Sequence, residues 1–213
     1  MPKKTKKRGG LTPDKYLSDS QLKKLRQYVK DMADLARARG SHRNIVNEFI
    51  IELLLNSGLR AGELCKLDIK DLPVSHGKDS IWIRNGKGNV TRTVDIPESL
   101  KKRIARYVKL YRKNTGPDDP VFLSEQKNRL SYHLLYFRVK RIGKKAGVGN
   151  LYPHVLRHTY LTRLYNVEHD LRFVQDQAGH ASPETTAIYA KTNNKARKRQ
   201  VEALDETDPP PGQ

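Results

Sequence analysis

The chain has 213 residues, of which 42 are Lys or Arg and 23 are Asp or Glu, so its formal net charge at pH 7 is +19. One cysteine, Cys65, excludes a disulfide framework, and no apolar run of the sequence approaches the thickness of a bilayer. The excess charge is compatible with an ordinary basic protein, but it favours a polyanionic partner, most commonly nucleic acid. We expect a soluble, cytoplasmic, DNA-associated protein without a membrane segment.

Residues 1–17 form a Lys- and Gly-rich arm without periodicity. From Ser18 to Gly40 the apolar residues recur at helical spacing and predict a first helix. A second helix is predicted over the apolar positions that end near Leu54, with Gly58 as its C-cap. A short third helix begins at about Arg60.

The pattern changes to strands after Pro73. Residues 81–83 and 90–96 predict two strands around Asn85-Gly86-Lys87-Gly88-Asn89, which is a hairpin signal. A helix follows over 98–112, and the apolar run at 121–123 predicts a third strand. Further helices are expected at 131–146, 153–166, 169–178, 182–189 and 194–205, before a Pro-rich, disordered tail at 206–213. The fold class is thus α+β and mainly helical, with one domain over 18–205 and a small antiparallel sheet of about three strands.

Several side chains with useful chemistry each have an ordinary explanation when taken alone. An Arg at a helix start (Arg60) is usually a surface charge, and a Lys at a hairpin tip (Lys87) is usually solubilising. His154 and His158 are spaced i,i+4 and could together hold a metal. However, no Glu lies between them as a zincin requires, and no third ligand suggests itself, so we reject zinc.

The order of the motifs is more informative than any single residue. The chain carries, in sequence, Arg60-Ala-Gly-Glu63-Leu64, Gly86-Lys87-Gly88, His154-Val-Leu156-Arg157-His158-Thr159, Gly179-His180, and Tyr189 nine residues further on. In identity, order and spacing this series resembles the catalytic domain of tyrosine recombinases, the phage integrase family. The resemblance covers about residues 16–202.

The resemblance implies an active site that binds a DNA phosphodiester. Arg60 and Arg157 would clamp the non-bridging oxygens, because a planar guanidinium donates two parallel hydrogen bonds and stays charged. His180 would donate a further hydrogen bond to the same phosphate. Glu63 would orient the first arginine without touching DNA.

The resemblance also implies which residues move the protons. Tyr189 would be the nucleophile and His154 would accept its proton, since a phenol with a pKa of about 10 must lose its proton during attack. Lys87 would protonate the departing 5′ oxygen, which an ammonium can do and a guanidinium practically cannot. The product would be a 3′-phosphotyrosyl enzyme, formed without metal, ATP or another cofactor.

Integration, excision and inversion share this chemistry, so the resemblance implies a site-specific recombinase of double-stranded DNA, such as one of a mobile element, without choosing among them. Strand exchange would take a tetramer, with accessory DNA-bending proteins as further partners. Most relatives carry a core-binding domain before the catalytic one, whereas only Met1 to Leu17 precede the first predicted helix here. We expect a minimal form, as in the fimbrial phase-variation invertases, or a fragment, with the basic arm partly replacing the missing clamp through Lys3, Lys4, Lys6, Lys7 and Arg8.

Three other functions compete with this interpretation. A type IB topoisomerase uses a similar set of Arg, Lys, His and Tyr residues but acts as a monomer. A non-catalytic DNA-binding protein of recombinase ancestry would lack a catalytic residue, and none is missing here. An RNA-binding or ribosomal protein would explain the charge but would leave the ordered series of motifs unexplained.

Overall fold

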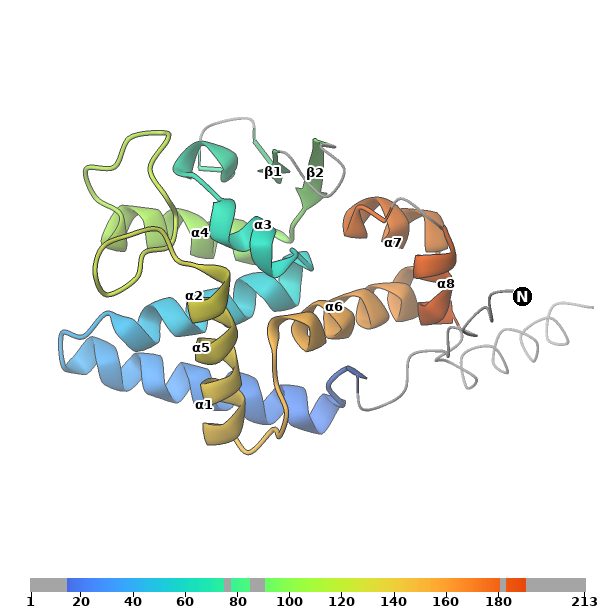
Figure 1. The fold of residues 1–213 in the computed structure, drawn as a ribbon, viewed down its shortest axis with the longest axis horizontal. Helices are drawn as coiled ribbons and strands as arrows, with labels where there is room; N and C mark the ends of the chain where they lie inside the picture. Colours follow the sequence, from blue (N-terminus) through green and yellow to red (C-terminus); the bar gives the residue numbers. More distant parts are fainter. Residues whose placement is uncertain (1–14, 75–77, 85–90, 181–182, 191–213) are drawn as a thin grey trace, which may run out of the picture.

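The computed structural model describes residues 15–74, 78–84, 91–180 and 183–190. The N-terminal helices α1 (Asp19–Ala38) and α2 (Arg43–Ser57) pack along each other (Figure 1). Ser18 begins α1 with a capping box, in which its hydroxyl accepts a hydrogen bond from the backbone N of Gln21 and the Gln21 side chain accepts one from the backbone N of Ser18. The predicted boundaries of both helices are confirmed.

Helix α2 is the centre of the main core. Its buried side chains lie on several faces and include Phe49, Ile50, Ile51, Leu53 and Leu54. It contacts α1, α4 (Glu98–Tyr111) and α6 (Pro153–Glu168), which explains why it is apolar around most of its circumference. The helix ends at Gly58, whose φ of 61° is left-handed and where a Cβ would meet the ring of Tyr160 at 2.3 Å. This close approach, together with the left-handed backbone, requires glycine.

The short helix α3 (Ala61–Lys66) and the 3₁₀ turn η2 (Ile69–Asp71) lead to a two-stranded antiparallel sheet of β1 (Ser80–Ile83) and β2 (Arg92–Asp95). The register pairs Ile81 with Val94, and both side chains are fully buried. The hairpin prediction is therefore confirmed for its two strands.

The predicted third strand at 121–123 is wrong. Within the described residues this segment makes only isolated bridges, between Asp68 and Pro120 and between Leu123 and Arg129. Pro120 has no N–H with which to extend a ladder, and the chain turns back at Ser124, whose backbone N donates to the carbonyl of Asn128. The run is apolar because Val121 and Phe122 are buried in the core, not because it is a strand.

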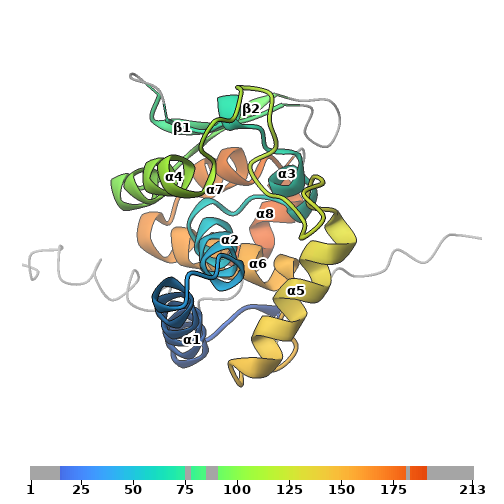
Figure 2. The ribbon, with the colours of Figure 1, turned by 90° about the vertical axis from the view of Figure 1, so that its left-hand side faces the viewer.

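The remaining helices of the described residues follow, and two of them, α4 and α6, contact α2. The helices that follow are α4 (Glu98–Tyr111), α5 (Tyr132–Lys145), α6 (Pro153–Glu168), α7 (Leu171–Ala178) and α8 (Pro183–Ala190). Helix α6 contacts α2, α5, α7 and α8, and it runs through the middle of the molecule between the sheet and α1 (Figure 2). The helical predictions from residue 98 to residue 190 are confirmed to within a few residues, whereas the helix predicted at 194–205 and the tail lie outside the described residues.

A second, smaller core lies among α6, α7 and α8. It is built from Leu161, Val174, Ala178 and Tyr189, and Tyr189 is only 1% exposed. The phenol is therefore part of the packing of the C-terminal helices. None of the helices in the described ranges is long and apolar enough to cross a membrane.

Candidate active site

Five of the residues singled out in the sequence come together where α3, α6, α7 and α8 meet. Arg60 is the N-cap of α3, His154 and Arg157 lie in the first turns of α6, His180 follows the C-cap of α7, and Tyr189 lies near the end of α8. Residues that are far apart in the sequence thus form one cluster, which is connected by the contacts described below.

Arg157 is the most enclosed cation of the cluster, with 2% of its surface exposed. Its Nη1 donates to the carbonyl of Gly58, and its Nη2 donates to the carbonyl of Ala178 and to Nε2 of His180 (3.0 Å). Burial, together with the charge of Arg60, lowers the pKa of Arg157 to about 10. The side chain therefore ties the end of α2 to the end of α7 and carries a buried positive charge.

Arg60 is held by two kinds of acceptor. Its Nη1 donates to Glu63 (2.8 Å) and its Nη2 donates to the carbonyl of Gly179 (2.6 Å). The backbone N of Arg60 also donates to the carboxylate of Glu63, so one carboxylate positions both the helix start and the guanidinium. Glu63 thus contacts the Arg60 side chain directly, and its role in orienting Arg60 toward a phosphate stays a prediction.

Arg92, at the start of β2, shares this carboxylate. Its two Nη atoms donate to the two oxygens of Glu63 at 2.8 and 3.0 Å, in a bidentate pair. Burial alone would raise the pKa of Glu63, but the hydrogen bonds and charge of Arg92 and the hydrogen bonds of Arg60 lower it to about 2. Gly179 has a φ of 60°, and a Cβ there would meet the Arg92 side chain at 2.6 Å, so glycine leaves room for this arginine.

The tautomer of His180 follows from its partners. An arginine can only donate, so Nε2 of His180 accepts from Arg157, and the ring proton lies on Nδ1, 3.0 Å from the hydroxyl of Thr186. Burial, together with the charge of Arg157, lowers the pKa of His180 to about 4. The imidazole is therefore neutral at physiological pH.

The Tyr189 hydroxyl lies 2.8 Å from Nδ1 of His158. Burial raises the pKa of Tyr189 to about 12, against an opposing effect of Arg157. The ring of His158 in turn contacts that of His154, edge to face, with 4.3 Å between the ring centroids. Burial and the charge of Arg157 lower the pKa of His154.

The charges of the cluster do not cancel. Three guanidinium groups, those of Arg60, Arg92 and Arg157, lie close together, and Glu63 is the one carboxylate among the described residues that pairs with any of them. Such an excess of partly buried positive charge is costly unless an anion is bound. Within the described part of the chain, no three His, Cys, Asp or Glu side chains are grouped so that they could hold a metal ion.

Some predicted residues lie outside the described part of the chain. These are Lys87, between the two strands of the hairpin, and the cations of the N-terminal arm, Lys3, Lys4, Lys6, Lys7 and Arg8. Their roles stay predictions.

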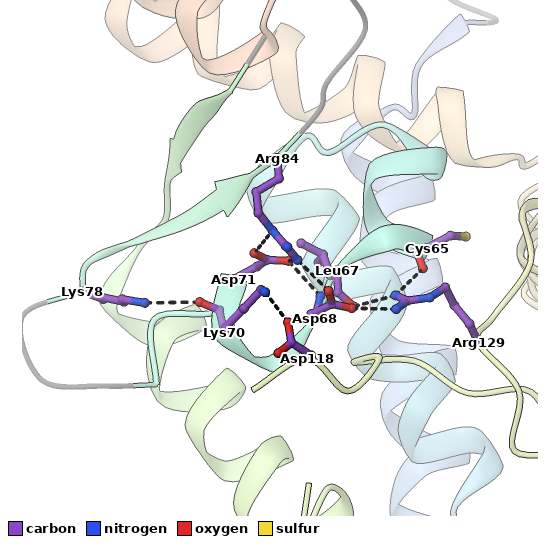
Figure 3. Close-up of polar contacts among 9 residues, drawn as sticks. All are labelled: Cys65, Leu67, Asp68, Lys70, Asp71, Lys78, Arg84, Asp118 and Arg129. Carbon is purple, nitrogen blue, oxygen red and sulfur yellow. Dashed lines mark hydrogen bonds and ion pairs between the residues drawn. The ribbon is translucent and has the colours of Figure 1, made fainter. Parts of the chain in front are cut away.

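The base of the hairpin is described, and an ion-pair network holds it. Arg84, directly after β1, donates to Asp71 through Nε and Nη2 and to Asp68 through Nη2, at 2.6 to 2.8 Å (Figure 3). Arg129 reaches the other oxygen of Asp68 at 2.7 Å. Both strands are thus anchored by an arginine, β1 through Arg84 to the η2 turn and β2 through Arg92 to α3.

Sequence reasoning missed two residues of the site. By pattern alone, Arg92 is a polar residue among strand formers, and His158 is half of a rejected metal pair. For Arg92 the signal was its position two residues before Val94, which places both side chains on the same, inward face of a half-buried strand. A charged side chain on such a face requires an acidic partner. For His158 the signal was its helical i,i+4 spacing from His154, which places both rings on one face.

The fold is that of a tyrosine recombinase catalytic domain. A crystal structure of XerA recombinase is similar over 98% of this chain and 68% of its own, with a TM-score of 0.71 and 28% sequence identity. A XerH recombinase bound to its difH substrate in a pre-cleavage complex is similar over 89% of this chain and 54% of its own, with a TM-score of 0.68 and 28% identity. The catalytic domain of bacteriophage HP1 integrase, 18% identical, shares the fold over 91% of this chain and 98% of its own, with a TM-score of 0.54.

The chain belongs to the phage integrase family, whose family model matches residues 15–196. A curated relative is the tyrosine recombinase XerA of Pyrococcus horikoshii, which is 37% identical over 162 residues, covering 75% of this chain and 55% of that protein. The chain spans about half the length of the curated relatives it matches.

Proposed function

We propose that this chain cuts and rejoins double-stranded DNA as the catalytic part of a site-specific recombinase, through a 3′-phosphotyrosyl bond to Tyr189. The observation that carries the proposal is the excess of guanidinium groups beside a tyrosine hydroxyl, which Glu63 alone among the carboxylates of the described residues pairs. A phosphodiester is the anion that this arrangement fits, because in-line attack adds negative charge to oxygens that fixed cations stabilise.

Arg157 and Arg60 would bind the non-bridging oxygens of the scissile phosphate. A guanidinium has five N–H donors, and the hydrogen bonds to carbonyls and to Glu63 occupy only some of them. These hydrogen bonds hold the guanidinium planes of Arg60 and Arg157 in position before DNA binds, so the arginines need little reorganisation at the moment of attack.

His180 would have to change its proton position when DNA binds. Its Nε2 accepts from Arg157 in the present structure and would have to carry a proton in order to donate to phosphate. Bound phosphate would itself favour that change, since it competes for Arg157 and stabilises a protonated imidazole. Lys87, by resemblance, would protonate the 5′ oxygen as it leaves.

The expected partners follow from the same chemistry. The solved XerH structure is of a recombinase bound to its difH substrate, which supports double-stranded DNA as the partner of this chain. Exchange of two strand pairs takes a tetramer, with accessory DNA-bending proteins as optional partners. The arginines supply the positive charge that a metal would otherwise provide, and the phosphotyrosyl ester conserves the bond energy, so neither metal nor ATP is required.

The test is covalent trapping. The protein and its Tyr189→Phe variant are incubated with labelled supercoiled DNA and with nicked suicide duplexes, without metal or ATP, and run on a denaturing gel. We expect a protein–DNA adduct with the wild type and none with Tyr189→Phe. Tight DNA binding without any adduct from the wild type, on DNA that contains the protein's recombination site, would contradict the proposal and support a binding-only protein.

A further inference from the structure

The contact between Tyr189 and His158 assigns a role to a residue outside the expected catalytic set. The hydroxyl of Tyr189 lies 2.8 Å from Nδ1 of His158, which is a hydrogen-bond distance. His158 is one helical turn beyond His154 on α6, so the two imidazoles share one face of that helix, and α8, which carries Tyr189, packs against α6 beside His158.

We propose that His158 is a catalytic residue that holds the hydroxyl of Tyr189 and accepts its proton during attack on DNA, the role that the resemblance gives to His154. This inference rests on the function proposed above. The burial of Tyr189 is the first reason: with 1% of its surface exposed, the phenol is packed among Leu161, Val174 and Ala178, and bulk water is not a ready proton acceptor for it.

The step balances in atoms and charge. In the tautomer of His158 that accepts from Tyr189, the ring proton is on Nε2; the proton of the Tyr189 hydroxyl moves to Nδ1, and an imidazolium results. The phenolic oxygen forms a bond to phosphorus as the bond from phosphorus to the 5′ oxygen breaks, and that oxygen takes a proton from Lys87. Religation reverses each transfer, so His158 returns the proton to Tyr189.

The electrostatic environment links this step to bound DNA. Burial, with the charges of His154, Arg157, His180 and Lys15, lowers the pKa of His158 to about 3, so the imidazole is neutral and the phenol keeps its proton. A phosphodiester at the arginine cluster would offset the cationic part of this effect and make His158 a stronger base. The nucleophile would therefore be activated only where a phosphate is in place.

The substitution test separates holding the hydroxyl from taking its proton. His158→Asn keeps a hydrogen-bonding atom near the position of Nδ1 but cannot become a cation at neutral pH. We expect single-turnover adduct formation to slow by about 100-fold, the lower range for loss of a general base. Introducing difluorotyrosine at position 189, whose hydroxyl is more acidic, should restore the variant selectively and change the wild-type rate little.

The matched control is His169→Asn, the same change at the exposed, left-handed C-cap of α6, where φ is 54° and asparagine is well tolerated. This variant should react at the wild-type rate. A His158→Asn protein that reacts as fast as wild type, or whose slow reaction difluorotyrosine does not relieve, overturns the assignment, because a purely structural defect is insensitive to the acidity of the phenol.

A second measurement leaves His158 in place. In protein labelled with ¹⁵N-histidine, the His158 signal should shift in the Tyr189→Phe variant, which removes the hydroxyl, and its pKa should rise when a short duplex carrying the recombination site is added. A His158 signal that responds to neither change overturns the inference. If the wild type still forms the DNA adduct in that case, the proposed function holds and only the inference about His158 fails. If the wild type forms no adduct, the proposed function and the inference fail together.

Discussion

Arg157 shows how a single side chain can serve both the fold and the chemistry. Its guanidinium bonds the carbonyls of Gly58 and Ala178 from inside the protein, which fixes the plane that would face a phosphate. A lysine retains the charge but donates from one point, so it cannot hold both carbonyls and a phosphate in the same plane.

At the residue scale we therefore expect Arg157→Lys and Arg60→Lys to reduce adduct formation by about 100-fold or more, the usual effect of removing a preorganised donor. Single-turnover cleavage of a suicide duplex measures this reduction, with Arg106→Lys on the exposed face of α4 as the control. If either active-site lysine variant reacts at nearly the wild-type rate, bidentate clamping is not what these arginines provide.

At the scale of elements, the hairpin is held at its base by ion pairs. Arg84 binds Asp68 and Asp71, and the hydrogen bonds that it donates to Asp71 and to Asp68 raise the pKa of Arg84 above its usual value. The short ladder between β1 and β2 supplies few backbone hydrogen bonds of its own, so these ion pairs and that of Arg92 help to fix the strand ends that flank the segment with Lys87.

If the hairpin delivers a general acid, Lys87→Ala should slow cleavage of ordinary DNA by about 100-fold or more, and Arg84→Met should slow it by about tenfold. Both variants should be much less impaired on DNA with a 5′-bridging phosphorothioate, whose sulfur leaves without a proton. Single-turnover rates on the two substrates provide the measurement. Equal slowing on both substrates would remove Lys87 from this role and Arg84 from its support.

At the scale of the whole molecule, the net charge of +19 exceeds what the catalytic cluster accounts for. Five of the cations lie within residues 2–10, in a segment whose sequence is without the apolar periodicity of a helix or strand. Such an arm neutralises phosphates without reading sequence, and each neutralised phosphate adds to the salt dependence of binding.

Deleting residues 2–10 should consequently weaken DNA binding and reduce the slope of log K against log salt by about 0.9 for each phosphate that the arm neutralises. Fluorescence anisotropy of a labelled duplex at several salt concentrations measures the slope. A deletion variant that keeps the full wild-type slope would show that the arm does not bind the DNA backbone.

The sequence by itself determined the helices, the hairpin and the order of the motifs, because these depend on local patterns. Ser18 and Gly58 mark helix ends through the geometry of the backbone beside them, and the spacing of His154 and Arg157 places them on one helix face whatever the tertiary structure. The short apolar run at 121–123 predicts a strand wrongly because burial in a core and membership of a sheet leave the same apolar pattern.

Only the tertiary structure decided which side chains meet. Arg92 pairs with Glu63 across 29 positions, and His158 meets Tyr189 across 31, because the fold places β2 beside α3 and α8 against α6. Helical spacing predicts that His154 and His158 share a face, but which ring lies nearest the hydroxyl depends on where α8 crosses α6. That crossing is set by side chains packing in a shared core, a long-range condition that no local pattern contains.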